Sequence, residues 1–179
     1  MKFFIASDIH GSFYYADKML RAFQREGADK LVLLGDILYH GPRNDLPKDY
    51  NPKAVIEAFN EISEKIICVR GNCDTEVDQM VLTFPIMSDY AVLFDSGLTI
   101  YLNHGHKTND ILPKLCDGNV LIGGHTHVPK SEKENGIYHL NPGSVSIPKE
   151  GSQHGYIVYE NKCFEWKNPD GRVYNKLEL

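Results

Sequence analysis

The sequence predicts an α/β fold: one domain over residues 1–179 that contains two packed β-sheets. In the first half, apolar runs alternate with amphipathic segments in the order β-α-β-α-β, whereas the second half is mostly short strands separated by turn residues. The length suits one domain with a full core, and the chain contains no repeat, low-complexity tract or linker.

The first half predicts three parallel strands joined by helices. Strands are expected at 2–7, 30–35 and 65–71, and helices at 14–26 and 52–63. The first helix has Met19, Leu20 and Phe23 on one face, and the second opens with Pro52 after Asn51, a candidate N-cap. Strands that alternate with helices in this way are expected to lie parallel in one sheet.

The second half predicts hairpins. Segments 90–95 and 98–103 flank a Ser96-Gly97 turn. Further strands are expected at 119–124, 136–141, 155–160 and 162–167, with a helix-like segment at 108–115 and a last turn at 168–171. Asn161 is expected to form the tight turn between two of these strands.

Composition excludes several classes of protein. The net charge of −5 gives no basic footprint, which argues against binding nucleic acid through its phosphates. The four cysteines are widely spaced, which argues against a disulfide framework and a thiolate zinc site. The apolar run at the N-terminus is too short for a signal peptide, and no segment approaches the roughly 20 residues that span a bilayer. We therefore expect no membrane association and a cytoplasmic location.

Five of the apolar runs are followed by polar side chains next to glycine. These side chains are Asp8 and His10 in "SDIHG", Asp36 in "GDILYHG", Asn72 and Asp74 in "GNCD", His104 and His106 in "NHGH", and His125 and His127 in "GGHTH". Because ligands bind at the carboxyl ends of strands in open α/β sheets, we expect these clusters to converge. Any one cluster is unspecific, but all five in this order predict a shared site.

The donor atoms in these clusters favour a two-metal site. The candidate ligands are Asp8, His10, Asp36, Asn72, His104, His125 and His127. Mixed oxygen and nitrogen donors suit Mn²⁺, Fe²⁺ or Zn²⁺ better than Ca²⁺. Seven donors suit two ions about 3.5–4 Å apart that share a carboxylate, an arrangement used for displacement at phosphorus. With two divalent ions, two aspartates and a hydroxide, the core carries about +1, which favours a phosphate oxyanion.

The ordered blocks D-x-H, G-D, G-N-x-D, a histidine before glycine, and G-H-T-H resemble the calcineurin-like metallophosphoesterase superfamily. The blocks span residues 8–127, and "NPGSV" at 141–145 is also similar. The short chain, "GDILYHGPRN" and the cysteine in "GNCD" most resemble the YfcE-type bacterial phosphodiesterases. The resemblance implies a four-layer αββα sandwich of two mixed sheets flanked by helices, with the metals at the sheet edges.

The resemblance also implies roles for the residues. Asp8, His10 and His127 would bind one metal, Asn72, His104 and His125 the other, and Asp36 would bridge the two. A hydroxide that bridges the ions would attack the phosphorus in line, and Asp74 would orient a neighbour. The implied cofactors are two divalent ions, with Mn²⁺ first and Zn²⁺, Fe²⁺, Ni²⁺ or Co²⁺ as alternatives.

Five other residues near these blocks have open roles. Cys73 occupies the position where many family members carry a histidine that protonates the leaving group. Because nearby cations favour the thiolate, Cys73 is a doubtful acid, and binding, redox sensitivity or no role remain open. His106 is either a substrate contact or a loop residue. Arg43, beside His40 and Asn44, either pairs with a phosphate oxygen or is a solvated loop arginine.

Two rival functions follow from the same resemblance. The eukaryotic retromer scaffold subunit has a similar fold and binds protein partners with little or no catalysis. A phosphomonoesterase or a nucleotide-specific diesterase is the second alternative. The complete set of ligand residues favours an enzyme, and the few basic residues around the core favour a small phosphodiester as substrate. Exposed edges of the C-terminal hairpins predict a homodimer or homotetramer.

Overall fold

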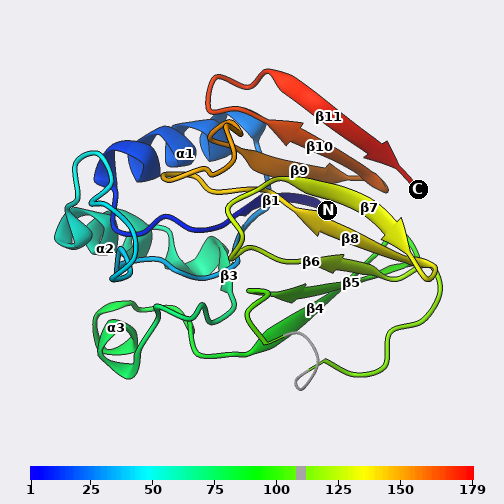
Figure 1. The fold of residues 1–179 in the computed structure, drawn as a ribbon, viewed down its shortest axis with the longest axis horizontal. Helices are drawn as coiled ribbons and strands as arrows, with labels where there is room; N and C mark the ends of the chain where they lie inside the picture. Colours follow the sequence, from blue (N-terminus) through cyan, green and yellow to red (C-terminus); the bar gives the residue numbers. More distant parts are fainter. Residues whose placement is uncertain (108–111) are drawn as a thin grey trace.

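The computed structural model describes residues 1–107 and 112–179 and contains two mixed β-sheets (Figure 1). The six-stranded sheet has the order β11-β10-β9-β1-β2-β3, and the five-stranded sheet has the order β4-β5-β6-β8-β7. The strands are β1 (Lys2–Ala6), β2 (Lys30–Leu33), β3 (Ile66–Cys68), β4 (Tyr90–Asp95), β5 (Leu98–Asn103), β6 (Val120–Ile122), β7 (Lys130–Glu134), β8 (Ile137–Asn141), β9 (Tyr156–Glu160), β10 (Cys163–Lys167) and β11 (Val173–Glu178). The helices are α1 (Phe13–Glu26), α2 (Pro52–Asn60), a 3₁₀ turn (Ser63–Lys65) and α3 (Glu76–Val81). The predicted fold class is confirmed.

Parallel strands in both sheets end on the same side of the molecule. As predicted, β1 pairs with β2 and β2 with β3 in parallel register. In the second sheet β5, β6 and β8 are also parallel. The arrowheads of β5, β6 and β8 in Figure 1 point away from the two labelled termini. The loops that follow these strands therefore gather along one edge of the two sheets.

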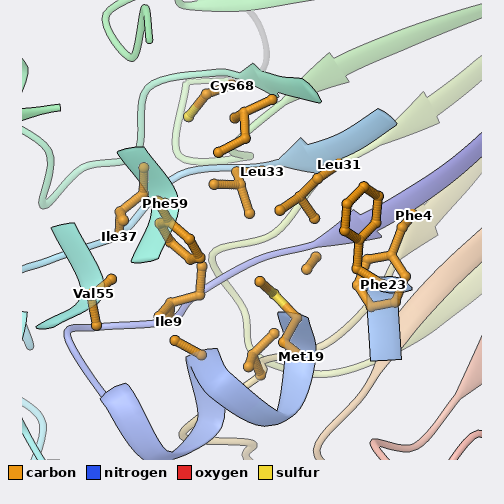
Figure 2. Packing of buried hydrophobic residues seen from close by; sticks show 14 of the residues in the cluster. Phe4, Ile9, Met19, Phe23, Leu31, Leu33, Ile37, Val55, Phe59 and Cys68 are labelled. Atoms are coloured by element: carbon orange, nitrogen blue, oxygen red, sulfur yellow. The ribbon is translucent and has the colours of Figure 1, made fainter. Parts of the chain in front are cut away.

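Helices α1 and α2 pack against one face of the six-stranded sheet. Asn51 caps α2 by accepting a hydrogen bond from Ala54 N, as predicted, and the Ser12 side chain caps α1, which was not predicted. Phe23 of α1 meets Phe4 of β1 edge to face, with ring centroids 5.9 Å apart (Figure 2). Fully burying a side chain of this size stabilises the fold by roughly 1.5–3 kcal/mol. The helices are therefore fixed to the sheet by their apolar faces.

The other face of the six-stranded sheet packs against the five-stranded sheet. Strand residues alternate between the two cores: Phe4 and Ala6 face the helices, while Phe3 and Ile5 face the second sheet. The core between the sheets also contains Val32, Leu34, Ile100, Leu102, Val120, Ile122, Leu140, Ile157, Tyr159, Phe164 and Trp166. Because both faces are covered, β1 and β2 read as continuous apolar runs in the sequence.

Two elements were not predicted. Strand β7 (KSEKE) is a mostly exposed edge strand without an apolar face, so its sequence pattern does not predict a strand. The Asn135-Gly136 turn, with φ of 50° and 82°, joins β7 to β8. Helix α3 has only six residues and depends on a capping box from Thr75 and Asp78. In Figure 1 it lies beyond the strand ends.

Two predicted helices differ from the structure. Residues 108–111 of the helix-like segment expected at 108–115 lie outside the described residues, and 112–115 are irregular. Helix α2 ends at Asn60, three residues earlier than expected, and a 3₁₀ turn follows it. In the part of the chain that the structure describes, no helix has both the length and the apolar character needed to cross a membrane.

Candidate metal centre

Several candidate ligands lie on backbone turned into the left-handed region. The φ angles are 57° at Asp8, 50° at His10, 56° at Asp36, 67° at His125 and 62° at His127. Non-glycine residues adopt this region rarely, and each costs about 1–3 kcal/mol unless the surroundings enforce it. Such positions cluster at functional sites. The bend after each strand is therefore made largely by the ligand residues, in addition to the glycines that the sequence emphasises.

Two glycines allow the loops to approach one another. A Cβ atom on Gly71 would overlap the side chain and backbone of Asp36. A Cβ atom on Gly124 would overlap Ser7 Oγ and lie 2.9 Å from Asp8 Oδ2. The loop after β3 is thereby pressed against the loop after β2, and the loop after β6 against the loop after β1.

Asp8, His10 and His127, which we call the deep half-site, lie together and buried. His10 Nδ1 donates to the Tyr39 carbonyl at 2.7 Å, and His127 Nδ1 donates to the Ile147 carbonyl at 2.8 Å. Because a carbonyl only accepts, both rings carry their proton on Nδ1, and the two Nε2 atoms face each other 3.3 Å apart. Two facing lone pairs fit a bound cation.

The Asp8 carboxylate completes this arrangement. Its Oδ2 accepts from His125 N at 3.0 Å, while its buried Oδ1 has no hydrogen-bond partner among the described residues. His127 Nε2 lies 3.3 Å from that Oδ1. Burial acts to raise the pKa of Asp8, but the adjacent imidazoles of His10, His127 and His104 hold it well below its ordinary range. A buried, unpartnered carboxylate oxygen beside two imidazole nitrogens fits a divalent ion.

Asp36 lies between the deep half-site and the remaining ligands. Its Oδ1 accepts from Cys73 N at 2.8 Å. Its Oδ2 lies 3.7 Å from His10 Nε2 and 3.4 Å from His104 Nε2. One carboxylate thus faces imidazoles on both sides, which is the arrangement that a bridging ligand requires.

Asn72, His104 and His125 form what we call the open half-site. His104 is buried, and its Nδ1 donates to the Leu34 carbonyl at 2.7 Å. Its Nε2 lies 3.0 Å from Asn72 Oδ1, and its ring centroid is 5.2 Å from that of His125. Burial acts to lower the pKa of His104, but Asp36 and Asp8 raise it to about 9. Asn72 is exposed and His125 partly exposed.

Asp74 supports the backbone of the site. Its Oδ2 accepts from Asp36 N at 2.8 Å and Gly71 N at 2.7 Å, and its Oδ1 accepts from Ile37 N at 2.9 Å. The buried carboxylate therefore ties the loop after β2 to the loop after β3. The family resemblance implies that Asp74 orients a neighbour. In the structure its carboxylate accepts hydrogen bonds from two backbone amides of the Asp36 turn.

Cys73 Sγ lies within this cluster. Ligand atoms of His10, Asp36 and Cys73 are all within 4.8 Å of one another. Burial, and then the Asp36 carboxylate, raise the pKa of the Cys73 thiol to about 12. The carboxylates therefore favour the thiol, whereas the cations predicted from the sequence favour the thiolate.

The ligands open into a cleft of about 410 Å³. It is lined by His10, Asp36, Gly41, Pro42, Arg43, Asn44, Asn72, Cys73, His125, Thr126, His127 and Lys149. Arg43 and Asn44, two of the three candidate substrate contacts, line it, and their contact with substrate stays a prediction. His40 is not among the lining residues: its ring packs edge to face on Tyr50, with centroids 5.3 Å apart. His106 is not among them either, and its ring lies 5.3 Å from that of His104.

Lys149 and Ser146 were not predicted as part of the site. Lys149 follows the segment "NPGSV" at 141–145. Ser144 Oγ and Ser146 Oγ donate to the Asp8 carbonyl at 2.7 and 3.0 Å. The sequence could have pointed to Lys149 only by its position, because it is a basic residue close after the family-like "NPGSV" segment.

Comparisons with known proteins agree with this geometry. Residues 1–162 match the model of the calcineurin-like phosphoesterase superfamily domain. The phosphodiesterase YfcE of Escherichia coli strain K12 is 48% identical over 162 residues, which cover 90% of this chain and 88% of that protein. The superfamily and the YfcE-type resemblance predicted from the sequence are therefore confirmed.

Solved structures show the same fold. The structure of the E. coli phosphoesterase YfcE superposes with a TM-score of 0.94 at 44% identity, covering 99% of this chain and 98% of that chain. A zinc complex of Vps29 from Entamoeba histolytica superposes with a TM-score of 0.65 at 18% identity, covering 99% and 98%, and at this identity it shows the fold alone. Together with the family match, these findings show that the chain belongs to the calcineurin-like phosphoesterase superfamily, whose members depend on divalent metal ions.

Proposed function

We propose that this protein is a metal-dependent phosphodiesterase that holds two divalent ions. The observation that carries the proposal is Asp36, whose carboxylate faces His10 on one side and His104 on the other. The 48% identity to a phosphodiesterase over 90% of the chain supports the choice of diesters. The family match supports metal dependence.

In this proposal each half-site binds one ion. The deep half-site holds the first through Asp8, His10 and His127, the open half-site holds the second through Asn72, His104 and His125, and Asp36 contacts both. When bound, two such ions supply a nucleophile by lowering the pKa of water, and positive charge that stabilises the transition state. The proposed ligands are nitrogen and oxygen donors and do not include the Cys73 thiol. Such a set favours Mn²⁺, with Zn²⁺, Fe²⁺, Ni²⁺ and Co²⁺ as alternatives.

The chain's own residues hold and orient the substrate. Arg43 and Asn44 line one wall of the cleft, where a guanidinium pairs with a non-bridging phosphate oxygen. Asp74 keeps the Asp36 turn in place through backbone amides. His106 lies beside His104 and His125, with ring centroids 5.3 and 6.1 Å away, and is the next candidate proton donor when Cys73 does not serve.

Two rival functions have some support. A protein-binding scaffold is one alternative, but the full ligand set and the 48% identity to YfcE favour an enzyme. A phosphomonoesterase or a nucleotide-specific diesterase is the other alternative. A cytoplasmic location and a homodimer or homotetramer stay predictions, and light scattering on the purified protein tests the oligomer.

Metal analysis combined with a panel of aryl mono- and diesters tests the proposed function. We expect about two ions per chain at saturation and faster turnover of diesters than of monoesters. Asp36→Ala and His104→Ala should lower diester turnover by about a thousandfold, since each removes a group that positions transition-state charge stabilisation. Asp17→Ala, an exposed residue of α1 that pairs with Arg21, is the matched control and should behave as wild type.

Three results would contradict the proposal. Full activity in both the Asp36 and His104 variants would remove the two-metal assignment. No turnover with any divalent metal, together with a tight protein partner, would favour the scaffold. Preference for monoesters would favour the phosphatase.

A further inference from the structure

Two cationic side chains line the cleft from different segments. Arg43 lies between β2 and α2, and Lys149 lies between β8 and β9. Neither forms an ion pair with a residue that the structure describes, whereas Lys130, Lys167 and Lys176 all do. The cleft therefore has two positive charges that its described residues leave unneutralised.

The backbone of Lys149 is fixed beside the deep half-site. Lys149 N donates to the His127 carbonyl at 3.2 Å, and Ser152 Oγ donates to the Lys149 carbonyl at 2.6 Å. Two residues earlier, the Ile147 carbonyl accepts from His127 Nδ1. The segment is thus joined to one ligand at two points, and it presents an exposed ammonium at the rim of the cleft.

Arg43 lies on the wall that contains Cys73. A Cβ atom on Gly41 would lie 3.3 Å from Cys73 Sγ, and Asn44 Nδ2 donates to the His40 carbonyl at 2.8 Å. The turn that carries Arg43 is thereby packed against the residue next to Asn72. In this scheme Arg43 is assigned to the phosphate that reacts, and Lys149, on the other segment, to a second group of the substrate.

Charge and volume point to a substrate with more than one phosphate. The proposed two-metal core carries about +1, which one diester phosphate already balances. Arg43 and Lys149 add two positive charges, and a phosphomonoester group carries about −1.5 to −2 at pH 7. The cleft of about 410 Å³ falls in the range of pockets that bury whole small molecules rather than a single ion.

We propose that the cleft takes phosphodiesters that carry a second, terminal phosphate on one alcohol arm, and that Lys149 binds this second phosphate. The inference rests on the proposed function, because it assigns a substrate class to the same site. A lysine ammonium binds phosphate as a compact point charge. Lys149 therefore selects substrates by the charge of the alcohol arm and does not discriminate between arms of different shape.

A matched pair of substrates tests the proposal. Thymidine 5′-(p-nitrophenyl phosphate) and its 3′-phosphorylated form have the same scissile bond and leaving group. With Mn²⁺ present, we expect kcat/KM to be about tenfold higher for the phosphorylated form, as one charge-assisted hydrogen bond provides. The ratio should fall as salt is raised, because the contact is exposed.

Variants locate the effect. Lys149→Gln should bring the ratio close to one, and Lys149→Arg should retain most of it. Arg43→Gln should lower both rates and keep the ratio. Lys53→Gln removes an exposed lysine of α2 outside the cleft lining, and it should leave the ratio unchanged.

A binding measurement separates the two proposals. Calorimetry on the Mn²⁺-loaded protein compares thymidine 3′,5′-bisphosphate with thymidine 5′-phosphate, and we expect about tenfold tighter binding of the bisphosphate, lost in Lys149→Gln. This preference without turnover of either ester would reject the proposed function and keep the role of Lys149. Equal binding and equal kcat/KM in the wild type, or a preference that survives Lys149→Gln, would overturn the inference.

Discussion

The two half-sites differ in how firmly the fold holds their side chains. In the deep half-site Asp8, His10 and His127 are at most 3% exposed, and both imidazoles donate to carbonyls. In the open half-site only His104 is held in this way. The ring of His125 makes no hydrogen bond with the described residues, and Asn72 is exposed. The fold thus pre-organises one set of ligands and leaves the other adjustable.

The difference follows from what lies behind each loop. The segment after β8 packs under the deep half-site, where Ser144, Ser146 and the Ile147 carbonyl contact Asp8 and His127. Asn72 lies on the loop after β3, an edge strand of its sheet, and among the described residues its Nδ2 donates only to the neighbouring Cys73 Sγ, at 3.2 Å. Since binding to an ordered site costs less conformational entropy, the deep half-site should bind its ion more tightly.

The largest expected effect comes from removing one histidine of each half-site. His127→Ala should lower diester turnover by about a hundred- to a thousandfold and remove the tightly held ion, because it leaves the buried Asp8 carboxylate without its partner. His125→Ala should also lower turnover but retain one ion. Metal content after dialysis against a weak chelator measures the difference.

A stepwise chelator titration of the wild-type protein completes this comparison. Two ions released in two separate steps agree with unequal half-sites. Release of both in one step, or loss of the tight ion in His125→Ala rather than in His127→Ala, would show that anchoring does not decide affinity.

Ser144→Ala together with Ser146→Ala tests the support of the deep half-site. Both hydroxyls donate to the Asp8 carbonyl. Their loss removes two hydrogen bonds that hold Asp8 in its left-handed conformation, at φ 57°. Indirect supports of this kind change metal affinity by about ten- to a hundredfold. We expect weaker binding of the tight ion only, measured by competition with a metal indicator. Ser131→Ala on β7 is the control, and an equal loss there would remove the claim.

Asp74→Asn tests the link between the loops that carry Asp36 and Asn72. The carboxylate accepts from three backbone amides, and an amide side chain would turn a donor toward at least one of them. Leaving such a buried group unsatisfied costs about 1–3 kcal/mol of folding stability. Denaturant unfolding measures the loss, with Asp17→Asn as control. Unchanged stability would mean that the two loops hold each other without Asp74.

Much of the fold followed from local pattern in the sequence. Buried strands such as β1 and β2 are continuous apolar runs, and Asn51 gives a capping signal for α2. Strand β7 was missed because an exposed edge strand needs no apolar face. That residues 1–179 form one domain stays a prediction.

The sequence indicated which polar side chains lie near one another, but not the geometry of their arrangement, and their roles stay predictions. Glycine-flanked Asp, Asn and His residues after five strands identified the cluster, because parallel strands bring their ends together. The sequence could not show that Asp8 and His127 themselves adopt positive φ. Nor could it place Lys149, whose position depends on a hydrogen bond to His127, a residue 22 positions earlier in the chain.

The smallest expected effect concerns Cys73, which lies between the half-sites with Sγ near His10 and Asp36. A general acid contributes up to about 10²–10⁴-fold when it is well placed, and most for leaving groups of high pKa. Neither a thiol held at high pKa nor a thiolate protonates an alkoxide efficiently. Wild-type hydrolysis should therefore be fast for aryl diesters and slow for alkyl diesters.

Cys73→His should flatten this dependence on leaving-group pKa. An introduced, unoptimised imidazole gains only a small part of the full effect, so we expect a few-fold rise for alkyl diesters and little change for aryl diesters. Rates for a series of diesters with graded leaving-group pKa measure the slope, and Cys73→Ser controls for loss of the sulfur. A slope already flat in the wild type would mean that another acid acts. His106, whose ring lies 5.3 Å from that of His104 and 6.1 Å from that of His125, is then the residue to replace, because it is the titratable side chain next to the open half-site that the ligand assignment leaves unused.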